Sequence, residues 1–464
     1  MKRHVSVQTS PAQTPMDSDG IVERLAALLK DRTEGYEIFF SSESGLSVEA
    51  KDRAVDSLKV RSSFGVGLRA AIGGRQGFSF TSALTDDALN GLVERCLASG
   101  QEATPDEYVR YVNAAAAATG SEAIPKDIYD SNFSAIPVEE KIKKALLIEE
   151  SAMSYDGRVK RIRKASYGET LKNTRVVNSN GVDRPYCATF YTASVTAVAE
   201  DAGDSQMGFE VSTSHIFGGI APEEVGASAA RNAVRMLGAR KWKTVKCPAV
   251  FENSVVCEFI ETIAGSFLAD NVLKGKSMLR DKLGKIIASN AVSIYDDGVM
   301  KGGWATSGFD AEGAPRKTTP LIEAGVCSNY LYDSYWARRA GAESTGNAAR
   351  AGFKGLPSVG VSNIYLKKGD KTLAGLISAA SNGLFITELM GVHTVNTVNG
   401  DFSLGASGIL IEGGELSYPV RGMAVSGNLL KLFRSIVECG RDLRFYGSVG
   451  APSVLANEVE MSGD

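Results

Sequence analysis

Hydrophobic positions near the start of the chain change from a helical to an alternating spacing. Ile21, Leu25 and Leu29 fall on one face of a helix, which predicts a helix over residues 18–30. Alternating segments then predict short strands at residues 36–40, 46–51, 58–61 and 65–71. Gly73 and Gly74 predict a hairpin turn after the last of them, because glycine readily adopts positive φ.

Between residues 85 and 239 the pattern mixes helices with further strands. We expect helices over residues 85–98, where Thr85 is a suitable N-cap, over 138–153 after Pro137, and over 222–238. Residues 160–168 and 170–177 are expected to form one hairpin, and a turn at 178–181 leads into a strand at 187–199.

The C-terminal half is richer in glycine and has one clear long helix, expected over residues 254–270 and apolar around most of its circumference, which predicts burial. Short strands follow Trp304, and a last helix is expected at 429–439. The chain is therefore expected to be an α+β protein. A flexible tail (1–17) precedes an N-terminal region of antiparallel strands and helices (18–238), followed by a mostly antiparallel β domain with one buried helix (239–464).

Composition narrows the function classes. Of 464 residues, 44% are hydrophobic and 23% are charged, which is typical of a globular protein. A formal charge of −3 argues against a strongly basic nucleic-acid binder. We expect no membrane span and no secretory signal, because long apolar stretches are missing. Six cysteines without a C-x-x-C pair suit a reducing, cytoplasmic environment.

In each of two pairs of carboxylates, the two side chains could lie on the same face of their own segment. Glu258 and Glu261 are three apart on the expected buried helix, and Asp310 and Glu312 alternate on an extended segment. Paired carboxylates can carry out acid–base chemistry. The simpler interpretations are an exposed stripe near a helix N-terminus for the first pair and a solvated turn for the second.

Histidine chemistry is sparse. The three histidines, His4, His215 and His393, lie far apart, and H-E-x-x-H is missing from the sequence. His393 lies in a polar, loop-like run with Asn396, where a histidine is more often structural than catalytic, because a general base needs an orienting partner.

Several segments together resemble the TldD/PmbA family. They are Phe64-Gly-Val-Gly-Leu-Arg69, Gly308-Phe-Asp-Ala-Glu-Gly313, Gly383-Leu-Phe-Ile-Thr-Glu388, Gly400-Asp-Phe-Ser-Leu-Gly405, Ile411-Glu-Gly-Gly-Glu-Leu416 and Gly447-Ser-Val-Gly-Ala-Pro-Ser453. This resemblance covers most of the chain after the tail. It implies a cytoplasmic metalloprotease system in which a metal-bearing TldD-type subunit pairs with a TldE (PmbA) subunit and cuts unfolded peptides.

The resemblance also indicates which subunit this is. TldD-type chains carry H-E-x-x-x-H on the long C-terminal helix, and alignment from Asp270 places Ile260, Glu261 and Gly265 on that motif. Isoleucine and glycine provide no metal ligand. The resemblance therefore implies a TldE/PmbA-type subunit without a metal or other cofactor, although Cys439 lies near the place of a TldD-type cysteine.

These observations predict a non-metal subunit that helps to enclose a peptide channel, with Asp310, Glu312, His393 and Asn396 as possible channel residues. We expect a heterodimer with a TldD-type chain, a homodimer when the chain is alone, unfolded peptides as substrates, and neither membrane nor direct nucleic-acid contact. The alternatives are an independent non-metal hydrolase that uses His393 as base, and a DNA-gyrase-associated binding protein.

Overall fold

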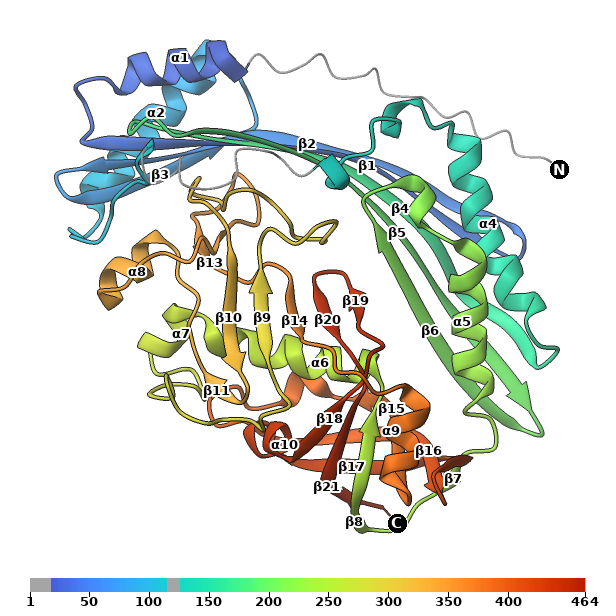
Figure 1. The fold of residues 1–464 in the computed structure, drawn as a ribbon. Coiled ribbons are helices and arrows are strands. Elements are labelled where there is room, and N and C mark those ends of the chain that lie inside the picture. Colours follow the sequence, from blue (N-terminus) through green and yellow to red (C-terminus); the bar gives the residue numbers. More distant parts are fainter. Residues whose placement is uncertain (1–17, 115–125, 464) are drawn as a thin grey trace.

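A long curved sheet arches over a C-terminal body in the computed structural model, which describes residues 18–114 and 126–463 (Figure 1). The expected tail at residues 1–17 lies outside the described residues. The sheet has the order β3-β2-β1-β4-β5-β6, and all neighbouring strands are antiparallel. Its strands are β1 (Gly35–Lys51), β2 (Ala54–Ile72), β3 (Arg75–Thr81), β4 (Val159–Asn178), β5 (Asp183–Asp201) and β6 (Asp204–Ser214).

Two pairs of helices cover the convex face of this sheet. Helices α1 (Ser18–Leu29) and α2 (Asp86–Glu102) pack at one end, and α4 (Val138–Ser154) and α5 (Pro222–Val234) pack at the other (Figure 1). Thr85 caps α2 as expected, because its side chain accepts a hydrogen bond from the Ala88 N–H. The hairpin at Gly73 and Gly74 is also confirmed, with both residues at positive φ.

The strands are longer than expected. β1 runs unbroken through residues 41–45, β2 joins the segments 58–61 and 65–71, and β4 joins 160–168 and 170–177, so the separate strands and the hairpin expected there are wrong. Along β1 the hydrophobic alternation is interrupted, because the middle of this strand lies between the two helix pairs. Gly168 of β4, which resembles a turn residue, pairs with both Ser47 and Thr192 inside the sheet.

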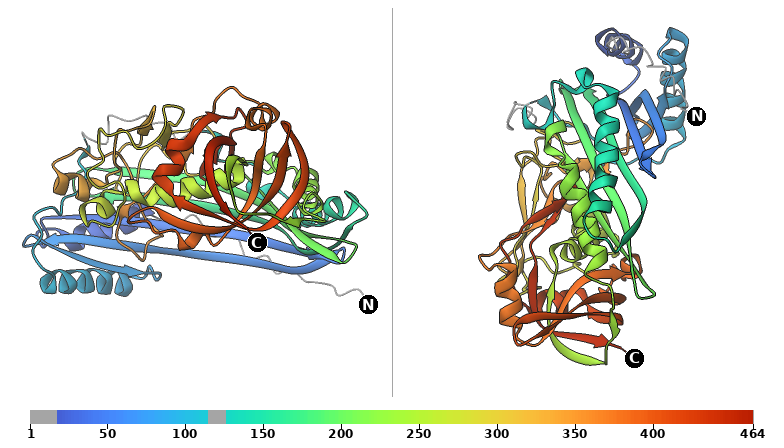
Figure 2. Two further views of the ribbon diagram at one scale, coloured as in Figure 1. Left: turned by 90° about the horizontal axis from the view of Figure 1, so that it is seen from below. Right: turned by 90° about the vertical axis from the view of Figure 1, so that its right-hand side faces the viewer.

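The C-terminal body contains a closed barrel. Strands β8 (Val245–Phe251), β15 (Gly383–Met390), β16 (Asp401–Glu412), β17 (Glu415–Asn428) and β21 (Val454–Ser462) follow one another, and β21 returns to pair with β17. The short strands β7 (Arg240–Lys241) and β18 (Ile436–Cys439) extend this sheet. Figure 2 shows the later, red strands of this sheet curling around a core, while β1 and β2 extend along one side of the molecule.

A second sheet lies between the barrel and the arch. Its order is β11-β10-β9-β14-β20-β19, formed by Val326–Cys327, Thr318–Glu323, Ile294–Asp297, Ile364–Leu366, Val449–Ala451 and Arg444–Tyr446. A separate pair is β12 (Ala348–Ala349) with β13 (Ser358–Val359). The remaining α-helices of the described body are α6 (Asn253–Ala264), α7 (Ala269–Leu273), α8 (Ser334–Ala340), α9 (Leu373–Ala380) and α10 (Leu429–Ser435).

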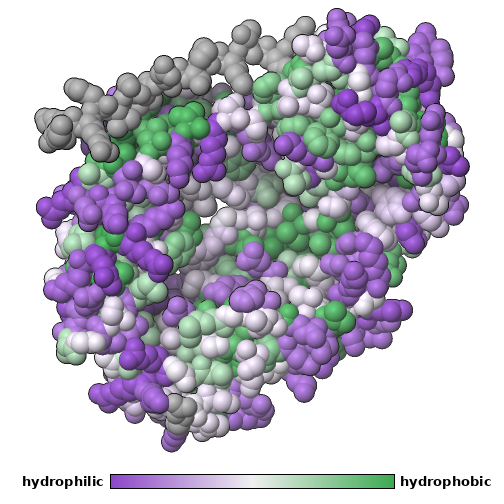
Figure 3. Space-filling model, turned by 180° about the vertical axis from the view of Figure 1, so that it is seen from behind, coloured by the Kyte–Doolittle hydropathy of each residue, from purple (hydrophilic) through white to green (hydrophobic). Residues whose placement is uncertain are grey.

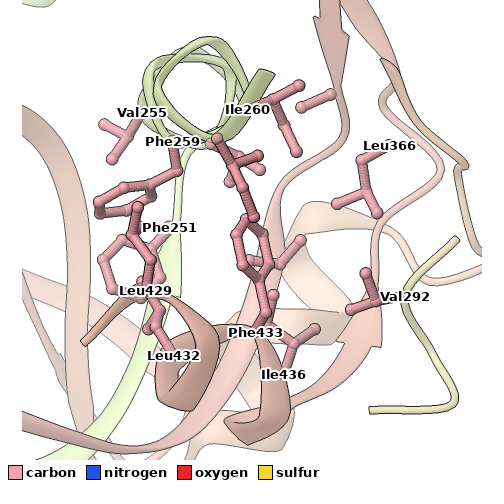
Figure 4. Packing of buried hydrophobic residues seen from close by; sticks show 14 of the residues in the cluster. Phe251, Val255, Phe259, Ile260, Val292, Leu366, Leu429, Leu432, Phe433 and Ile436 are labelled. Carbon is pink, nitrogen blue, oxygen red and sulfur yellow. The ribbon is translucent and has the colours of Figure 1, made fainter. Parts of the chain in front are cut away.

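The expected buried helix is α6, but it ends earlier than predicted. After Ala264 the chain tightens into a 3-10 turn, and Leu268 is extended before α7 begins. The apolar side of α6 packs against the barrel and α10, where Phe259 and Ile260 meet Phe251 and Phe433 (Figure 4). The last helix is also shorter, because residues 436–439 form β18 rather than continuing α10.

The α+β class, with an antiparallel N-terminal sheet and a mostly antiparallel C-terminal β region, is confirmed. The division at residue 238 stays a prediction. Among the described residues, no helix is long and apolar enough to cross a bilayer.

Candidate functional site

The concave face of the arch carries an open, polar cleft. Its volume is about 770 Å³, and it lies over the middle of β1, β2, β4 and β5, with Trp304 of the body on its wall. The cleft residues include many hydroxyl groups and glycines, among them Ser47, Ser63, Ser166, Gly168, Thr170 and Thr192. The space-filling view from behind shows the hollow between the arch and the body (Figure 3).

Strand alternation explains why this face is polar. Leu46 and Val48 of β1 and Tyr191 and Ala193 of β5 point into the core beneath α4 and α5. Because successive side chains of a strand point to opposite faces, the residues between them, such as Ser47 and Thr192, face the cleft. The helices therefore take the apolar face of the sheet and leave a face of small polar groups toward the body.

Charged side chains on the cleft are arranged as ion pairs across strands. Lys164 lies 2.9 Å from Glu49, and Lys172 lies 3.4 Å from Glu43. The hydrogen bond from Lys164 lowers the pKa of Glu49 below its ordinary value. Arg61 also lines the cleft. The site thus presents both signs of charge, which suits a ligand of mixed composition.

An aromatic group closes one end of the cleft. The rings of Phe190 and Trp304 meet edge to face with centroids 4.8 Å apart. His215, which follows β6 and is 3% exposed, packs behind them, 4.9 Å from Phe190 and 5.5 Å from Trp304. Phe190 belongs to the arch and Trp304 to the body, so this contact fixes the cleft wall across both parts.

The motif positions on α6 do not face a common site. Ile260 is fully buried in the core below α6 (Figure 4). Glu261 is exposed. Gly265 begins the 3-10 turn, and its carbonyl accepts a hydrogen bond from the Asn271 side chain at 2.8 Å. Within the described residues, no group of three or more His, Cys, Asp or Glu side chains is placed to hold a metal ion. Isoleucine and glycine have no side-chain metal ligand, so the metal of a metallopeptidase does not fit positions 260 and 265.

The polar side of α6 instead gathers carboxylates. Burial, together with the charges of Glu261 and of Glu388 on β15, raises the pKa of Glu258 to about 7. Burial likewise raises the pKa of Glu388, against the opposing effect of Arg235. Glu258 and Glu261 thus share a face, as their spacing predicts.

Asp310 and Glu312 lie elsewhere, in a buried network that joins the arch to the body. Glu312 accepts hydrogen bonds from Arg69 at 2.9 Å and from the Ser334 N–H at 2.9 Å, and Arg69 also pairs with Glu37. Asp310 accepts hydrogen bonds from the N–H groups of Glu312, Ala314 and Ala348. Every carboxylate oxygen of the pair thus has a partner inside the protein.

His393 and Asn396 lie in and after the 3-10 turn Val392–Thr394, and both are exposed. The Asn396 side chain accepts hydrogen bonds from Val398 and Asn399 and so shapes its own loop. None of the four expected channel residues is among the described residues that line the cleft. Their part in holding peptide stays a prediction.

Sequence reasoning missed the cleft itself. One signal was available, because Ser47, Ser166, Gly168, Thr170 and Thr192 alternate with buried positions along their strands. The sequence pattern, however, predicted β1 and β4 as separate short strands. The small polar positions were therefore not recognised as one face.

Comparison with known proteins covers almost the whole described chain. Three family models match: PmbA/TldA metallopeptidase domain 1 at residues 36–100, the central domain at 131–237 and the C-terminal domain at 244–463. Metalloprotease PmbA of Escherichia coli O157:H7 is 27% identical over 440 residues, which are 94% of each chain. A PmbA homologue of Buchnera aphidicola (strain Bp) is 30% identical over 70% of this chain and 71% of its own.

A solved structure shares the fold as well. The protein from Thermotoga maritima, described as a candidate modulator of a DNA gyrase, superposes with a TM-score of 0.87 at 27% identity, over 96% of this chain and all of that one.

Proposed function

Because the chain belongs to the PmbA/TldD metallopeptidase family, we propose that it is the PmbA (TldE) type of subunit, without a metal of its own, in a cytoplasmic peptidase that acts on unfolded peptides. Its partner is a TldD-type chain that supplies the metal. This proposal rests on the residues at the two histidine positions of the motif. Ile260 is a core residue, and Gly265 lacks a side chain.

The polar cleft is where this subunit contributes to substrate handling. An extended peptide could instead join a sheet edge, but some backbone groups on both edges of the arch already have partners. On β6, the Phe209 carbonyl accepts a hydrogen bond from Asn232, and the Val211 carbonyl accepts one from Arg444. On β3, Ser99 bonds both the N–H and the carbonyl of Phe78. The concave face, with its small hydroxyls and both signs of charge, therefore suits a sequence-tolerant peptide path.

The independent-hydrolase alternative gains little support. His393 is exposed, and among the described residues it has no carboxylate within hydrogen-bond distance to orient it as a base. The gyrase-associated alternative rests on the description of the Thermotoga relative. The net charge of the chain, −3, provides no electrostatic basis for direct contact with DNA.

The test combines this chain with a purified TldD-type partner and an unfolded peptide. We expect chelator-sensitive cleavage by the mixture, none by this chain alone, and a mass in light scattering equal to one copy of each chain. Cleavage by this chain alone that resists chelators and is lost in His393→Ala would instead support the independent hydrolase.

A cleft-filling variant tests the peptide path. Ser47→Trp places a large ring on the concave face, and we expect it to reduce cleavage by the mixture at least tenfold while assembly is retained. Ser42→Trp is the matched control, because residue 42 lies on the other face of the same strand. Equal effects of the two variants would place the peptide path outside the cleft.

A further inference from the structure

One half of β2 has no neighbouring strand on its outer side. β3 pairs with β2 only from Val66 onward, whereas the pairing of β2 with β1 continues back to Ala54. Residues 57–61 of β2 are therefore an open edge of the arch among the described strands. In Figure 2 the blue strands of this part run along an outer side of the molecule.

The backbone of this edge presents hydrogen-bonding groups outward at alternate residues. The Ala71 carbonyl accepts a hydrogen bond from the Glu34 N–H on the β1 side, and the register with β1 is regular from there back to Ser57. Residues of odd number therefore turn their N–H and carbonyl groups toward β1, whereas Leu58 and Val60 turn theirs outward. Such groups can bond an extended chain that joins the sheet as a further strand.

The convex side of the edge offers a small apolar surface. Leu58 and Val60 pair with Val48 and Leu46 of β1, whose side chains lie in the core beneath α4 and α5. Directly paired residues share a face of the sheet, so Leu58 and Val60 also point to the convex side. Leu58 packs against that core, but Val60 is 53% exposed, because β3 does not reach it.

The concave side of the edge carries positive charge without a partner. Lys59 and Arg61 alternate with the apolar residues, both are exposed, and Arg61 lines the cleft. Within the part of the chain that the structure describes, neither forms an ion pair, and the Glu49 carboxylate on the same face of β1 is bonded to Lys164. A chain added here would meet two cations on the cleft side and an apolar side chain on the other.

A second copy of this chain is a poor occupant of the edge. Two copies joined antiparallel about a two-fold axis at Val60 would place Lys59 of each copy opposite Arg61 of the other, and an axis at either cation would oppose two identical charges. Like charges opposite one another destabilise a strand pair. Charge complementarity instead favours a strand with carboxylates at alternate positions.

We propose that residues 57–61 of β2 bind an extended acidic peptide segment as an added strand, with its carboxylates toward Lys59 and Arg61 and its apolar side chains beside Val60. Backbone bonds make the site tolerant of sequence, and the two cations add a preference for alternating acidic and apolar residues. That such a segment belongs to a substrate of the cleft rests on the proposed function, whereas binding of acidic peptide by the free chain does not.

Fluorescence anisotropy with the full chain tests the chemistry of the edge. The probe is a short labelled peptide of alternating glutamate and valine, and lysine replaces glutamate in the control peptide. We expect the acidic peptide to bind at least tenfold more tightly, with an advantage that shrinks as salt is added. Equal binding of the two peptides would overturn the proposal, and the cations would then only protect an open edge from pairing with another chain.

Methylated peptides test the added strand on the unaltered chain. A strand directs alternate backbone amides to opposite sides, so only one side of the peptide can bond the edge. One acidic peptide is methylated at its valine nitrogens and another at its glutamate nitrogens, and both keep their charge. We expect one of the two to lose at least tenfold in affinity and the other to bind nearly as tightly as the parent. The same affinity for both would contradict an added strand.

Variants of the chain test the location on β2. Lys59→Glu should weaken binding of the acidic peptide at least tenfold, whereas Lys143→Glu, which reverses an exposed charge on α4, should not. Val60→Pro removes an outward N–H but no bond to β1, so it should also weaken binding. Circular dichroism checks that each variant folds. Unchanged binding by folded Lys59→Glu would overturn the proposal, and so would displacement of the peptide by a TldD-type chain, which would assign the edge to the partner interface.

Discussion

At the scale of single residues, the connection between arch and body depends on buried charge. Glu37 and Arg69 of the arch meet Glu312 and Arg350 of the body, and all four side chains are 5% exposed or less. Burial alone raises the pKa of Glu312, but Arg69 and the Ser334 N–H outweigh it and hold that pKa below its ordinary value. Glu312 therefore stabilises the fold when ionised, and this contribution is lost as the pH falls through its folded-state pKa.

Removing one member of this network leaves a buried charge without its partner. We expect Glu312→Ala to lower the free energy of unfolding by about 3–5 kcal/mol at pH 7, measured by urea denaturation. Glu94→Ala is the control, because its pair with Arg32 is exposed and such pairs contribute about 1 kcal/mol at most. A loss at Glu312 no larger than at Glu94 would mean that the network is not an effective link.

For Glu258, the pH dependence of stability has the opposite sign. Its pKa of about 7 lies above the ordinary value, so the ionised form is disfavoured in the folded protein. The stability of the wild type should therefore fall as the pH rises from about 4.3, the unfolded value, toward the folded value. Glu258→Gln removes this dependence.

We expect Glu258→Gln to raise the free energy of unfolding at pH 8, relative to its effect at pH 4, by about 1 kcal/mol once solvent screening of this half-buried group is allowed for. Denaturation at the two pH values measures the difference. Glu102→Gln, at the exposed end of α2, should show no such difference. A gain that is the same at both pH values would assign the effect to something other than ionisation.

At the scale of helices and strands, local signals were reliable where one residue determines the geometry. The Thr85 cap and the Gly73–Gly74 turn follow from side-chain and backbone chemistry alone, and the structure confirms both. Helices α8 and α9 are also capped, by Asp333 and Thr372, but they lie among glycine-rich segments that predicted only strands. Strand lengths and the cleft could not be predicted, because they depend on which faces the distant helices cover.

Close packing of α5 on α4 depends on a missing side chain. A Cβ at Gly226 would lie 2.6 Å from the Ile148 carbonyl oxygen and 2.7 Å from the Ala152 nitrogen, both backbone atoms. Alanine normally stabilises a helix relative to glycine by about 0.5–1 kcal/mol, but here the two helices would have to separate.

We therefore expect Gly226→Ala to lower the free energy of unfolding by about 1–3 kcal/mol. Gly91→Ala in α2 is the matched control. There the added Cβ would meet only the flexible end of Arg95, and we expect a gain of about 0.5–1 kcal/mol. Thermal or urea unfolding distinguishes the two, and a gain in both would show that α5 can shift without cost.

At the scale of the whole molecule, several separate contacts tie the arch to the body. Arg444 pairs with Glu210, Arg421 with Asp204, and Arg69 with Glu312. These contacts are spread along the length of the sheet. The two parts should therefore unfold together even though each has its own hydrophobic core.

We expect one unfolding transition, with the same midpoint by tryptophan fluorescence and by circular dichroism. All three tryptophans lie at positions 242–336, so fluorescence reports on the body, whereas the long helices α2, α4 and α5 of the arch contribute strongly to the dichroism. Two separated midpoints would show that the arch and the body are independent units.

The barrel is closed by β21, which comes later in the sequence than the other barrel strands. Residues 424–426 of β17 pair with residues 460–462 of β21, and β21 also pairs with β8, which is more than 190 residues earlier. Ribosomal synthesis releases the chain from its N-terminus, so the arch can form while the barrel still lacks the strand that joins its two sides. The nascent body therefore has two unpaired strand edges until residues 454–462 leave the ribosome. A stop codon just before residue 454 would leave an arch attached to a body that cannot close, which is a natural target for chaperones and quality-control proteases.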